Sequence, residues 1–370
     1  MQRMTVVYRV RSDAASIGAR AQAIALEQSV EMPLAAISSE AVLRDVAGEV
    51  QDIAEVGPGL FEVRIGLAVE SMGLDAGQLM NMLFGNTSLQ EDVTLLDAEI
   101  PDAMARHFGG PNYGISGLRK MCGAGPRALT CTALKPQGMA PEELAALAGQ
   151  IAAGGIDFIK DDHGLADQTY SRFADRVRAC AGAVCHASDD TGLLTCYVPN
   201  VSGDLNMAAA QIGLAMEEGI EAVLAAPMII GLSNFNRLVR DFPGMAFFAH
   251  PAMAGASRIA PPLLLGKLFR LFGADVTIFP NHGGRFSYST ETCRAIADEA
   301  RKPLGALKRC MPAPAGGMTL ERVTELLDFY GPDTMLLIGG SLLAAKDRLT
   351  AEAVAFQARV ARHFEGARDG

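Results

Sequence analysis

From residue 128 to the end of the chain, short apolar runs alternate with longer amphipathic stretches, and this alternation restricts the fold more than any other feature. Eight runs are typical of buried strands, at residues 128–134, 155–160, 193–198, 221–226, 245–250, 274–279, 306–311 and 334–338. Helical stretches lie between them, for example at 141–153, 205–218, 262–272 and 319–330. Eight strand–helix units over roughly 240 residues predict a TIM barrel, with catalytic side chains at the carboxyl ends of the strands.

The N-terminal part of the chain has a different pattern, which predicts a separate α+β domain over residues 1–115. The elements expected there are strands at 5–10, 50–56 and 60–69 and helices at 14–28 and 75–82. Glycines and prolines between residues 109 and 126 mark a boundary, so the barrel domain is expected over residues 125–370. The fold class is therefore α/β, a C-terminal (βα)8 barrel preceded by a smaller domain.

Charge and composition exclude several kinds of partner. A net charge of −10 argues against nucleic acid or an anionic membrane surface as the main partner. Charged residues or glycines interrupt every apolar run before the roughly 20 residues that span a bilayer, and the alternating strand at residues 5–10 argues against a signal peptide. Seven cysteines without a C-x-x-C pair fit reduced thiols, so we expect a cytoplasmic protein.

The second predicted strand ends in Lys160, Asp161, Asp162 and His163. Residues two apart in a strand point to the same side, so the side chains of Lys160 and Asp162 are expected to converge. Two interpretations remain open at this stage. The lysine forms a buried ion pair, or it is neutral and reacts with carbon dioxide, so that its carbamate and the neighbouring acid bind a divalent cation.

Other candidate residues also follow predicted strands. Lys135, His250 and His282 come at or just after strand ends. Glycine pairs follow the seventh and eighth predicted strands, at Gly316-Gly317 and Gly339-Gly340. Backbone amides of these two loops commonly hold a phosphate group in TIM barrels, although glycine pairs are also frequent in ordinary turns.

Two segments of the barrel resemble motifs of the RuBisCO superfamily. Residues 154–164, GGIDFIKDDHG, resemble the metal-site segment G-G-x-D-F-x-K-x-D-E, and residues 132–138, TALKPQG, resemble T-x-x-K-P-K-x-G. The two lysines are 25 residues apart, the length of one strand–helix unit. The resemblance implies that Lys160 is carbamylated and binds Mg²⁺ together with Asp162. It also implies that Lys135 removes the proton whose loss creates an enediolate; the alternative role for Lys135 is to pair with a phosphate or carboxylate.

The sequence departs from this family at several positions. His163 stands where the family has a glutamate, and imidazole suits Mn²⁺, Co²⁺ or Zn²⁺ better than Mg²⁺. His163 therefore either ligates a softer ion or bonds the substrate or a metal-bound water. Gln137 replaces the lysine that assists carbon dioxide capture, Pro251 replaces the arginine that holds a second phosphate, and the loop at 280–286 lacks the mobile lysine of carboxylases. These losses predict enolisation without carbon dioxide fixation.

The remaining expectations also come from the resemblance. Arg285 is expected to cover the phosphate, and His282 either assists proton transfer or is a loop histidine without a role. Glu27, in ALEQS, and Asn86, in LFGNT, resemble segments that reach into the barrel of a partner subunit, which implies a homodimer with shared active sites. The alternatives are that Asn86 caps a helix and that Glu27 is simply solvated.

Among RuBisCO-like proteins, the short form with K-D-D-H resembles the branch that isomerises 5-methylthioribulose 1-phosphate in methionine salvage. Three alternatives remain. The first is a decarboxylase of a phosphorylated branched 3-oxo sugar acid such as 3-oxo-isoapionate 4-phosphate. The second is a diketo-methylthiopentyl phosphate enolase, and the third is a barrel without enzymatic activity. The motifs do not separate the three enzymes, because each of them needs a divalent metal, one phosphate site and an enolate-type intermediate.

Overall fold

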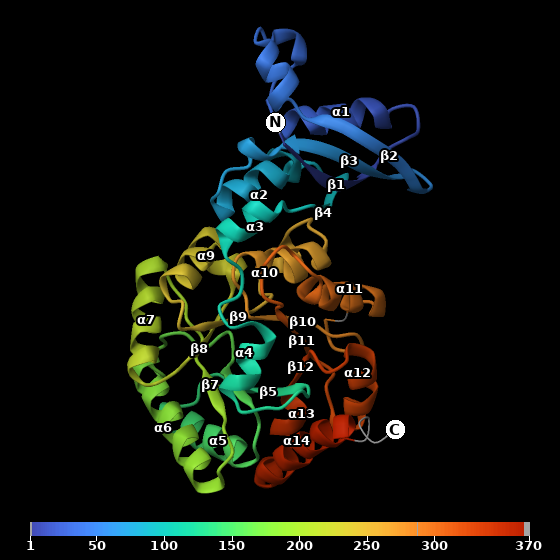
Figure 1. Cartoon of the computed structure of the whole chain (residues 1–370). Helices are drawn as coiled ribbons and strands as arrows, with labels where there is room; N and C mark the ends of the chain where they lie inside the picture. Colours follow the sequence, from blue (N-terminus) through green and yellow to red (C-terminus); the bar gives the residue numbers. More distant parts are fainter. Residues whose placement is uncertain (1, 287, 366–370) are drawn as a thin grey trace. The chain divides into compact units, whose positions relative to one another are not determined.

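The computed structural model describes residues 2–286 and 288–365, which form two compact units (Figure 1). The first unit contains the chain up to Phe108 together with residues 253–264 and 304–307. The second unit contains Gly109–Ala252, Leu265–Pro303 and the chain from Lys308 onward. Within the described residues, every helix is too short or too polar to cross a membrane.

The first unit is built on an antiparallel sheet with the strand order β2-β3-β1-β4. Its strands are β1 (Arg3–Arg11), β2 (Glu49–Gly57), β3 (Leu60–Ala68) and β4 (Val93–Ala98). Its helices are α1 (Ile17–Glu27), α2 (Ala76–Phe84) and α3 (Asp102–Phe108), with short turns η1 (Leu34–Ala36), η2 (Val42–Val46), η3 (Val69–Ser71), η4 (Asn86–Leu89) and η5 (Ala254–Ala256). The predicted strands and helices of this part are confirmed, whereas β4 and α3 were missed.

The second unit is a barrel of eight parallel strands in the order β7-β6-β5-β12-β11-β10-β9-β8. The strands are β5 (Leu129–Leu134), β6 (Phe158–Asp161), β7 (Cys196–Val198), β8 (Ala222–Ala225), β9 (Ala246–Ala249), β10 (Val276–Pro280), β11 (Met311–Ala315) and β12 (Met335–Ile338). The sheet closes between β7 and β8, where Val201 N–H donates to the Leu224 carbonyl and Leu224 N–H donates to the Pro199 carbonyl, both at 2.8 Å. The predicted barrel is therefore confirmed.

Apart from α4 (Gly114–Met121), which precedes β5, the helices of this unit follow the strands and surround the barrel (Figure 1). They are α5 (Pro141–Ala153), α6 (Phe173–Thr191), α7 (Leu205–Glu217), α8 (Pro227–Ile230), α9 (Leu232–Asp241), η6 (Pro262–Leu268), α10 (Phe269–Leu271), α11 (Thr290–Arg301), η7 (Leu320–Arg322), α12 (Val323–Tyr330), α13 (Gly340–Leu343), η8 (Lys346–Arg348) and α14 (Leu349–Glu365). The seventh strand was predicted at 306–311, too early in the chain, and shares only Met311 with the observed strand. The true strand, β11, has the sequence MPAPA, and its two prolines argue against a central strand because they cannot donate to the ladder.

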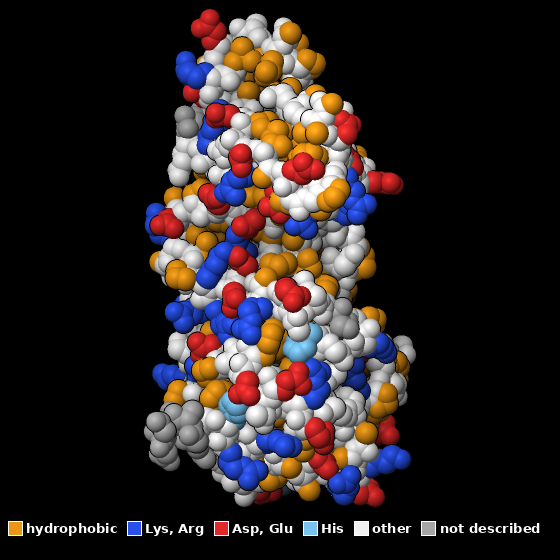
Figure 2. All heavy atoms as spheres, turned by 90° about the vertical axis from the view of Figure 1, so that its right-hand side faces the viewer, with side chains coloured by type: hydrophobic (Ala, Val, Ile, Leu, Met, Phe, Trp, Pro, Cys, Tyr) orange, Lys and Arg blue, Asp and Glu red, His pale blue; other side chains and the backbone are white. Residues whose placement is uncertain are grey.

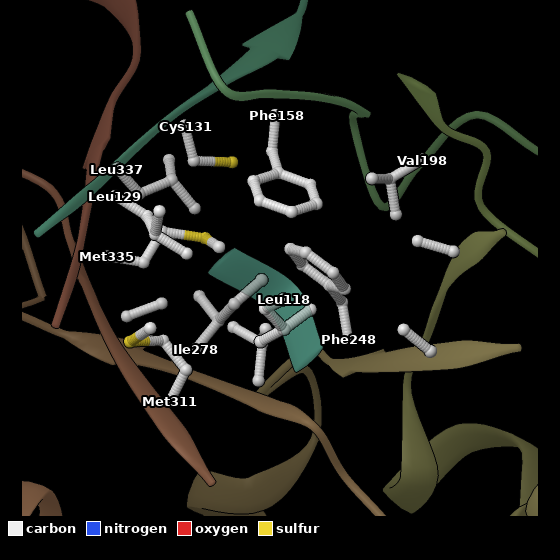
Figure 3. Close-up of a cluster of buried hydrophobic side chains, with 14 of the residues drawn as sticks. Leu118, Leu129, Cys131, Phe158, Val198, Phe248, Ile278, Met311, Met335 and Leu337 are labelled. Atoms are coloured by element: carbon white, nitrogen blue, oxygen red, sulfur yellow. The ribbon is translucent and has the colours of Figure 1, made fainter. Parts of the chain in front are cut away.

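The barrel interior is filled by every second residue of the strands, including Cys131, Phe158, Phe248 and Ile278 (Figure 3). Helix α4 adds Leu118 to this cluster. Its first residues bond to Asp275, which directly precedes β10, so α4 covers the amino end of the barrel. The carboxyl end is left to polar side chains.

On the face shown in Figure 2, acidic and basic side chains are interspersed over the surface. Basic residues are present on that face but do not gather into one region of it. That face therefore offers no continuous basic surface of the kind that binds a nucleic acid backbone.

Candidate active site

Strand β6 sends alternate side chains to opposite sides. Phe158 belongs to the interior cluster, and Lys160 and Asp162 continue the same inward series toward the carboxyl end. Asp161 points outward, where its carboxylate accepts hydrogen bonds from Tyr197 Oη at 2.7 Å and Arg176 Nε at 3.1 Å. The structure thus brings Lys160 and Asp162 to one side, as their spacing predicts, and uses Asp161 to fix the strand to its neighbours.

Lys160 is buried, with only 3% of its surface exposed. Its Nζ donates to the backbone carbonyl of Asp161 at 2.9 Å, and within the described residues no carboxylate oxygen lies within 4.0 Å of it. Burial lowers the pKa of this lysine, because the charged form loses its hydration. Burial thus acts toward the neutral amine, the form that reacts with carbon dioxide, whereas the charge of Asp162 acts toward the positive form, so both interpretations of Lys160 stay open.

Asp162 is the point at which the side chains of the carboxyl end meet. Its Oδ1 lies 3.0 Å from Lys135 Nζ and 3.4 Å from His163 Nδ1, and its Oδ2 lies 3.5 Å from Gln137 Nε2. Burial by itself would raise the pKa of Asp162. The hydrogen bond from His163 and the positive charges of Lys160 and Lys135 outweigh burial and hold that pKa well below its usual range.

His163 and His250 stack with their ring centroids 4.0 Å apart and an angle of 10° between the planes. The N–H of Ala252 donates to His250 Nδ1 at 3.1 Å, so the ring proton of His250 resides on Nε2. Burial, followed by the charge of Lys160, lowers the pKa of His250 to about 2. His250 is therefore a neutral hydrogen-bond donor that backs the ring of His163.

The residues at this end fit a divalent cation only in part. Across residues 2–286 and 288–365, no three His, Cys, Asp or Glu side chains gather as a metal site. Asp162 and His163 offer one carboxylate and one imidazole side by side. A carbamate on the neighbouring Lys160 would add oxygen ligands, which Mg²⁺ prefers. The fit to a metal thus depends on that modification.

The glycine pairs predicted for phosphate lie in loops that are joined to one another. Gly316 and Gly317 have φ of +91° and +66°, which a residue with a side chain rarely adopts. Gly339 precedes α13, whose Ser341 Oγ donates to the carbonyl of Met318 at 2.6 Å. The loops after β11 and β12 therefore meet, as a phosphate cradle in a TIM barrel requires.

The loop after β10 carries two candidate residues, Arg285 and His282, and their side chains have different surroundings. The Arg285 guanidinium lies over the exposed ring of Phe286, 4.5 Å from the centroid. The ring of His282 packs edge-on against Phe329 of α12 at 5.0 Å, and its Nε2 is buried without a hydrogen-bond partner in the described part of the chain. His282 is thus held by α12, and burial lowers its pKa.

Sequence reasoning missed Arg322, whose guanidinium donates to the backbone carbonyls of Gly317 and His282 at 2.9 and 3.3 Å. Arg322 and Glu325 lie three residues apart just after the glycine pair, and their side chains bond at 2.8 Å. That Arg-x-x-Glu spacing at the start of a helix was the available signal.

In the first unit, the two candidates come together. Asn86 Nδ2 donates to Glu27 Oε1 at 2.9 Å. Between them, the buried Gln28 side chain donates to the Met82 carbonyl at 2.8 Å and accepts from Thr87 N–H at 3.2 Å. Asn86 is the first residue of η4, yet its side chain bonds Glu27 and makes no cap, and Glu27 is not simply solvated.

An eight-stranded barrel with two lysines and an aspartate at its carboxyl end, and glycine loops after its last strands, defines an α/β-barrel enzyme of the RuBisCO type. The family described as "Ribulose bisphosphate carboxylase large chain, catalytic domain" matches residues 114–367. The chain belongs to this family, and its similarities place it among the RuBisCO-like proteins.

Three similarities define that position. A protein of Rhodospirillum rubrum named 5-methylthioribulose-1-phosphate isomerase is 57% identical over 97% of this chain and 96% of its own length. The crystal structure of a Rubisco-like protein from Rhodopseudomonas palustris is 52% identical and covers 98% of both chains, with a TM-score of 0.92. A 2,3-diketo-5-methylthiopentyl-1-phosphate enolase of Geobacillus thermodenitrificans is 31% identical over 94% of this chain and 89% of its own length.

Proposed function

We propose that this protein is an isomerase of 5-methylthioribulose 1-phosphate that acts in methionine salvage by enolising its substrate. The observation that carries the proposal is the meeting of Lys135 with Asp162, beside the buried Lys160, at the carboxyl end of the barrel. The isomerase of Rhodospirillum rubrum, 57% identical over nearly the whole chain, supports this substrate over the alternatives, since the enolase relative is only 31% identical.

Lys135 is the proposed base. Its side chain is 45% exposed, so its Nζ is accessible to a substrate at the carboxyl end, and Asp162 orients it from 3.0 Å. In its neutral form, this amine removes the proton from the carbon next to the ketose carbonyl. Return of the proton to a different carbon completes an isomerisation, whereas an enolase would leave the proton on the former carbonyl oxygen and release the enol. The neutral Nε2–H of His250 is a donor for a substrate oxygen.

We propose that Asp162, His163 and the carbamate of Lys160 hold a divalent cation, Mg²⁺ or a softer ion such as Mn²⁺. When bound, such an ion supplies electrophilic polarisation of the substrate carbonyl. The glycine loops at Gly316 and Gly339 are the proposed site of the single phosphate, with Arg285 over it. The lowered pKa of Lys160 and the positive φ of Gly316 support these two assignments.

The Glu27–Asn86 pair supports a homodimer in which each first unit completes the barrel site of a partner subunit. A hydrogen bond of 2.9 Å between these two residues presents a carboxylate and an amide together. All seven cysteines are free thiols, the state expected in the reducing cytoplasm, where we place the enzyme.

Carbon dioxide fixation is not part of this proposal. Gln137 lies 3.5 Å from Asp162 where carboxylases have a lysine, and Pro251 follows His250 where they have an arginine. A second phosphate would therefore have no cationic partner from that position.

The proposal is tested with purified protein, MgCl2 or MnCl2, bicarbonate and 5-methylthioribulose 1-phosphate. We expect an isomeric ketose phosphate in the ³¹P spectrum, and deuterium beside the carbonyl when the solvent is D2O. Parallel reactions contain ribulose bisphosphate with labelled bicarbonate, the diketo-methylthiopentyl phosphate, and the phosphorylated 3-oxo acid. Turnover of one of these three, with the methylthioribulose phosphate left unchanged, would contradict the proposal.

A further inference from the structure

Two glycine turns touch backbone to backbone at the carboxyl end of the barrel, Gly283-Gly284 after β10 and Gly316-Gly317 after β11. A Cβ on Gly284 would lie 2.9 Å from the carbonyl carbon of Gly316, and a Cβ on Gly317 would lie 2.6 Å from the carbonyl oxygen of Gly283. Real Cβ atoms essentially never come so close. The two loops therefore approach as only glycines allow, and their relative position is critical.

Arg322 joins these two loops with one amino group. Its Nη1 donates to the carbonyl of Gly317 at 2.9 Å and to the carbonyl of His282 at 3.3 Å. Glu325 holds the other side of the guanidinium, accepting from Nε at 3.1 Å and from Nη2 at 2.8 Å. This forked pairing fixes the plane of the guanidinium, which in turn fixes the two carbonyl groups.

The direction of these carbonyls sets the direction of two N–H groups. In a trans peptide the C=O and N–H bonds point opposite ways, so the N–H groups of Gly283 and Met318 point away from Arg322. Within the part of the chain that the structure describes, the N–H groups of Gly283, Gly317 and Met318 donate to no protein group. Backbone N–H groups presented in this way are suited to an anion.

We propose that Arg322 is a positioning residue for the substrate phosphate: by holding the Gly317 and His282 carbonyls, it turns the backbone N–H groups of both loops toward that phosphate. This inference rests on the proposed phosphate site. Arg322 does not itself contact the anion, because its donors face the two carbonyls, Glu325 and the ring Nδ1 of His282, which lies 3.4 Å from Nη2. Its effect is on binding, and the proton transfer at Lys135 is left largely unchanged.

The test compares Arg322→Met, Arg322→Lys and the wild type. Inorganic phosphate binding is measured by calorimetry, and KM and kcat are measured for the phosphorylated ketose. Hydrogen bonds of a charged group support a change of about 10-fold to 100-fold, so Arg322→Met should raise the phosphate Kd and the KM by that factor. The kcat should change less than about threefold, and Arg322→Lys should restore part of the affinity because one ammonium can hold one carbonyl.

The matched control is Arg237→Met, which removes an exposed arginine that pairs with Asp241 at 2.6 Å on α9 and should leave both constants unchanged. Should Arg322→Met fold poorly, Glu325→Gln releases the same guanidinium and should raise the phosphate Kd by roughly threefold to tenfold. Wild-type phosphate affinity in a folded Arg322→Met variant that is only less heat-stable would overturn the inference. A different result would separate this inference from the proposed function. If the wild type bound phosphate without isomerising the ketose, and Arg322→Met lost phosphate binding, the positioning role of Arg322 would be supported and the proposed reaction would be contradicted.

Discussion

At the amino end of the barrel, Asp275 is held by backbone groups, whereas at the carboxyl end the partners of Asp162 among the described residues are side chains. Asp275 accepts from the N–H groups of Tyr113, Gly114 and Phe247 at 2.6, 2.7 and 2.9 Å. The partners of Asp162 lie at 3.0 to 3.5 Å, and two of them, Lys135 and His163, are nearly half exposed. Fixed backbone donors stabilise a fold, while side chains that can turn are free to meet a substrate.

The pKa values of the two carboxyl groups differ for the same reason. Burial dominates at Asp275 and raises its pKa to about 6, although three N–H groups oppose the shift. At Asp162 burial acts in the same direction, but His163, Lys160 and Lys135 reverse it. Cations placed around one carboxylate thus distinguish the reactive end from the structural end.

The largest expected effect is at Lys160. Lys160→Ala should abolish isomerase activity and any stabilisation by Mg²⁺ or Mn²⁺, because the carbamate would be both a ligand and a negative charge at the site. Activity assays and thermal unfolding with and without metal check this. Metal-dependent activity in the variant would contradict the proposal that a carbamate on Lys160 binds the metal.

A control at the opposite end sharpens that comparison. Arg127 pairs with the buried Asp157 through two bonds of 2.7 Å. Arg127→Met should lower the free energy of unfolding by about 3 kcal/mol, since it leaves a buried carboxylate unpaired. The folded fraction should keep its metal response and its kcat.

Next in size is the base. Lys135→Ala should lower kcat by a factor of roughly 10² to 10⁴ and should lose deuterium exchange beside the carbonyl. Phosphate binding should persist, because the glycine loops do not depend on this lysine. Exchange at the wild-type rate would show that another group removes the proton.

A smaller effect is expected at Asp275, on stability alone. The folded pKa of about 6 lies above the unfolded value of about 3.9. The stabilisation from protonated Asp275 is therefore complete below about pH 4 and is lost as the pH rises through 6. Asp275→Asn should remove this pH dependence, and it should cost about 1–3 kcal/mol because its amide cannot accept from all three N–H groups. Urea unfolding at pH 5 and pH 7 measures both; an unchanged slope with pH would exclude Asp275 as its source.

The smallest effect is expected at His282. Its ring packs against Phe329, so His282→Ala should lower the free energy of unfolding by about 1–2 kcal/mol and change kcat less than about fivefold. If His282→Ala instead abolished deuterium exchange while Lys135→Ala kept it, the roles of the two residues would be reversed.

Most helices and strands could be predicted from the sequence because they depend on local patterns of apolar and polar residues. Helix α5 was predicted at 141–153, where the structure has it, and seven of the eight strands coincide closely with their predicted ranges, whereas β11 shares only Met311 with its range. The alternation that brings Lys160 and Asp162 to one side is a property of any strand, and motif spacing was enough to select Lys135. The prediction of strand β11 was inaccurate because its prolines weaken the local strand pattern. In the structure, pairing with the neighbouring strand β10 defines the place of β11 in the barrel.

What the sequence determined by itself is the barrel and the two lysines at its carboxyl end, because these depend on periodicity and on neighbours a few positions away. The loss of the carboxylation residues followed from comparing its motifs with those of the RuBisCO superfamily. Only the tertiary structure decided that Arg322 joins two glycine loops, that Glu27 meets Asn86 and that His282 packs on α12. These contacts join residues 5 to 59 positions apart, and their formation depends on how whole elements pack.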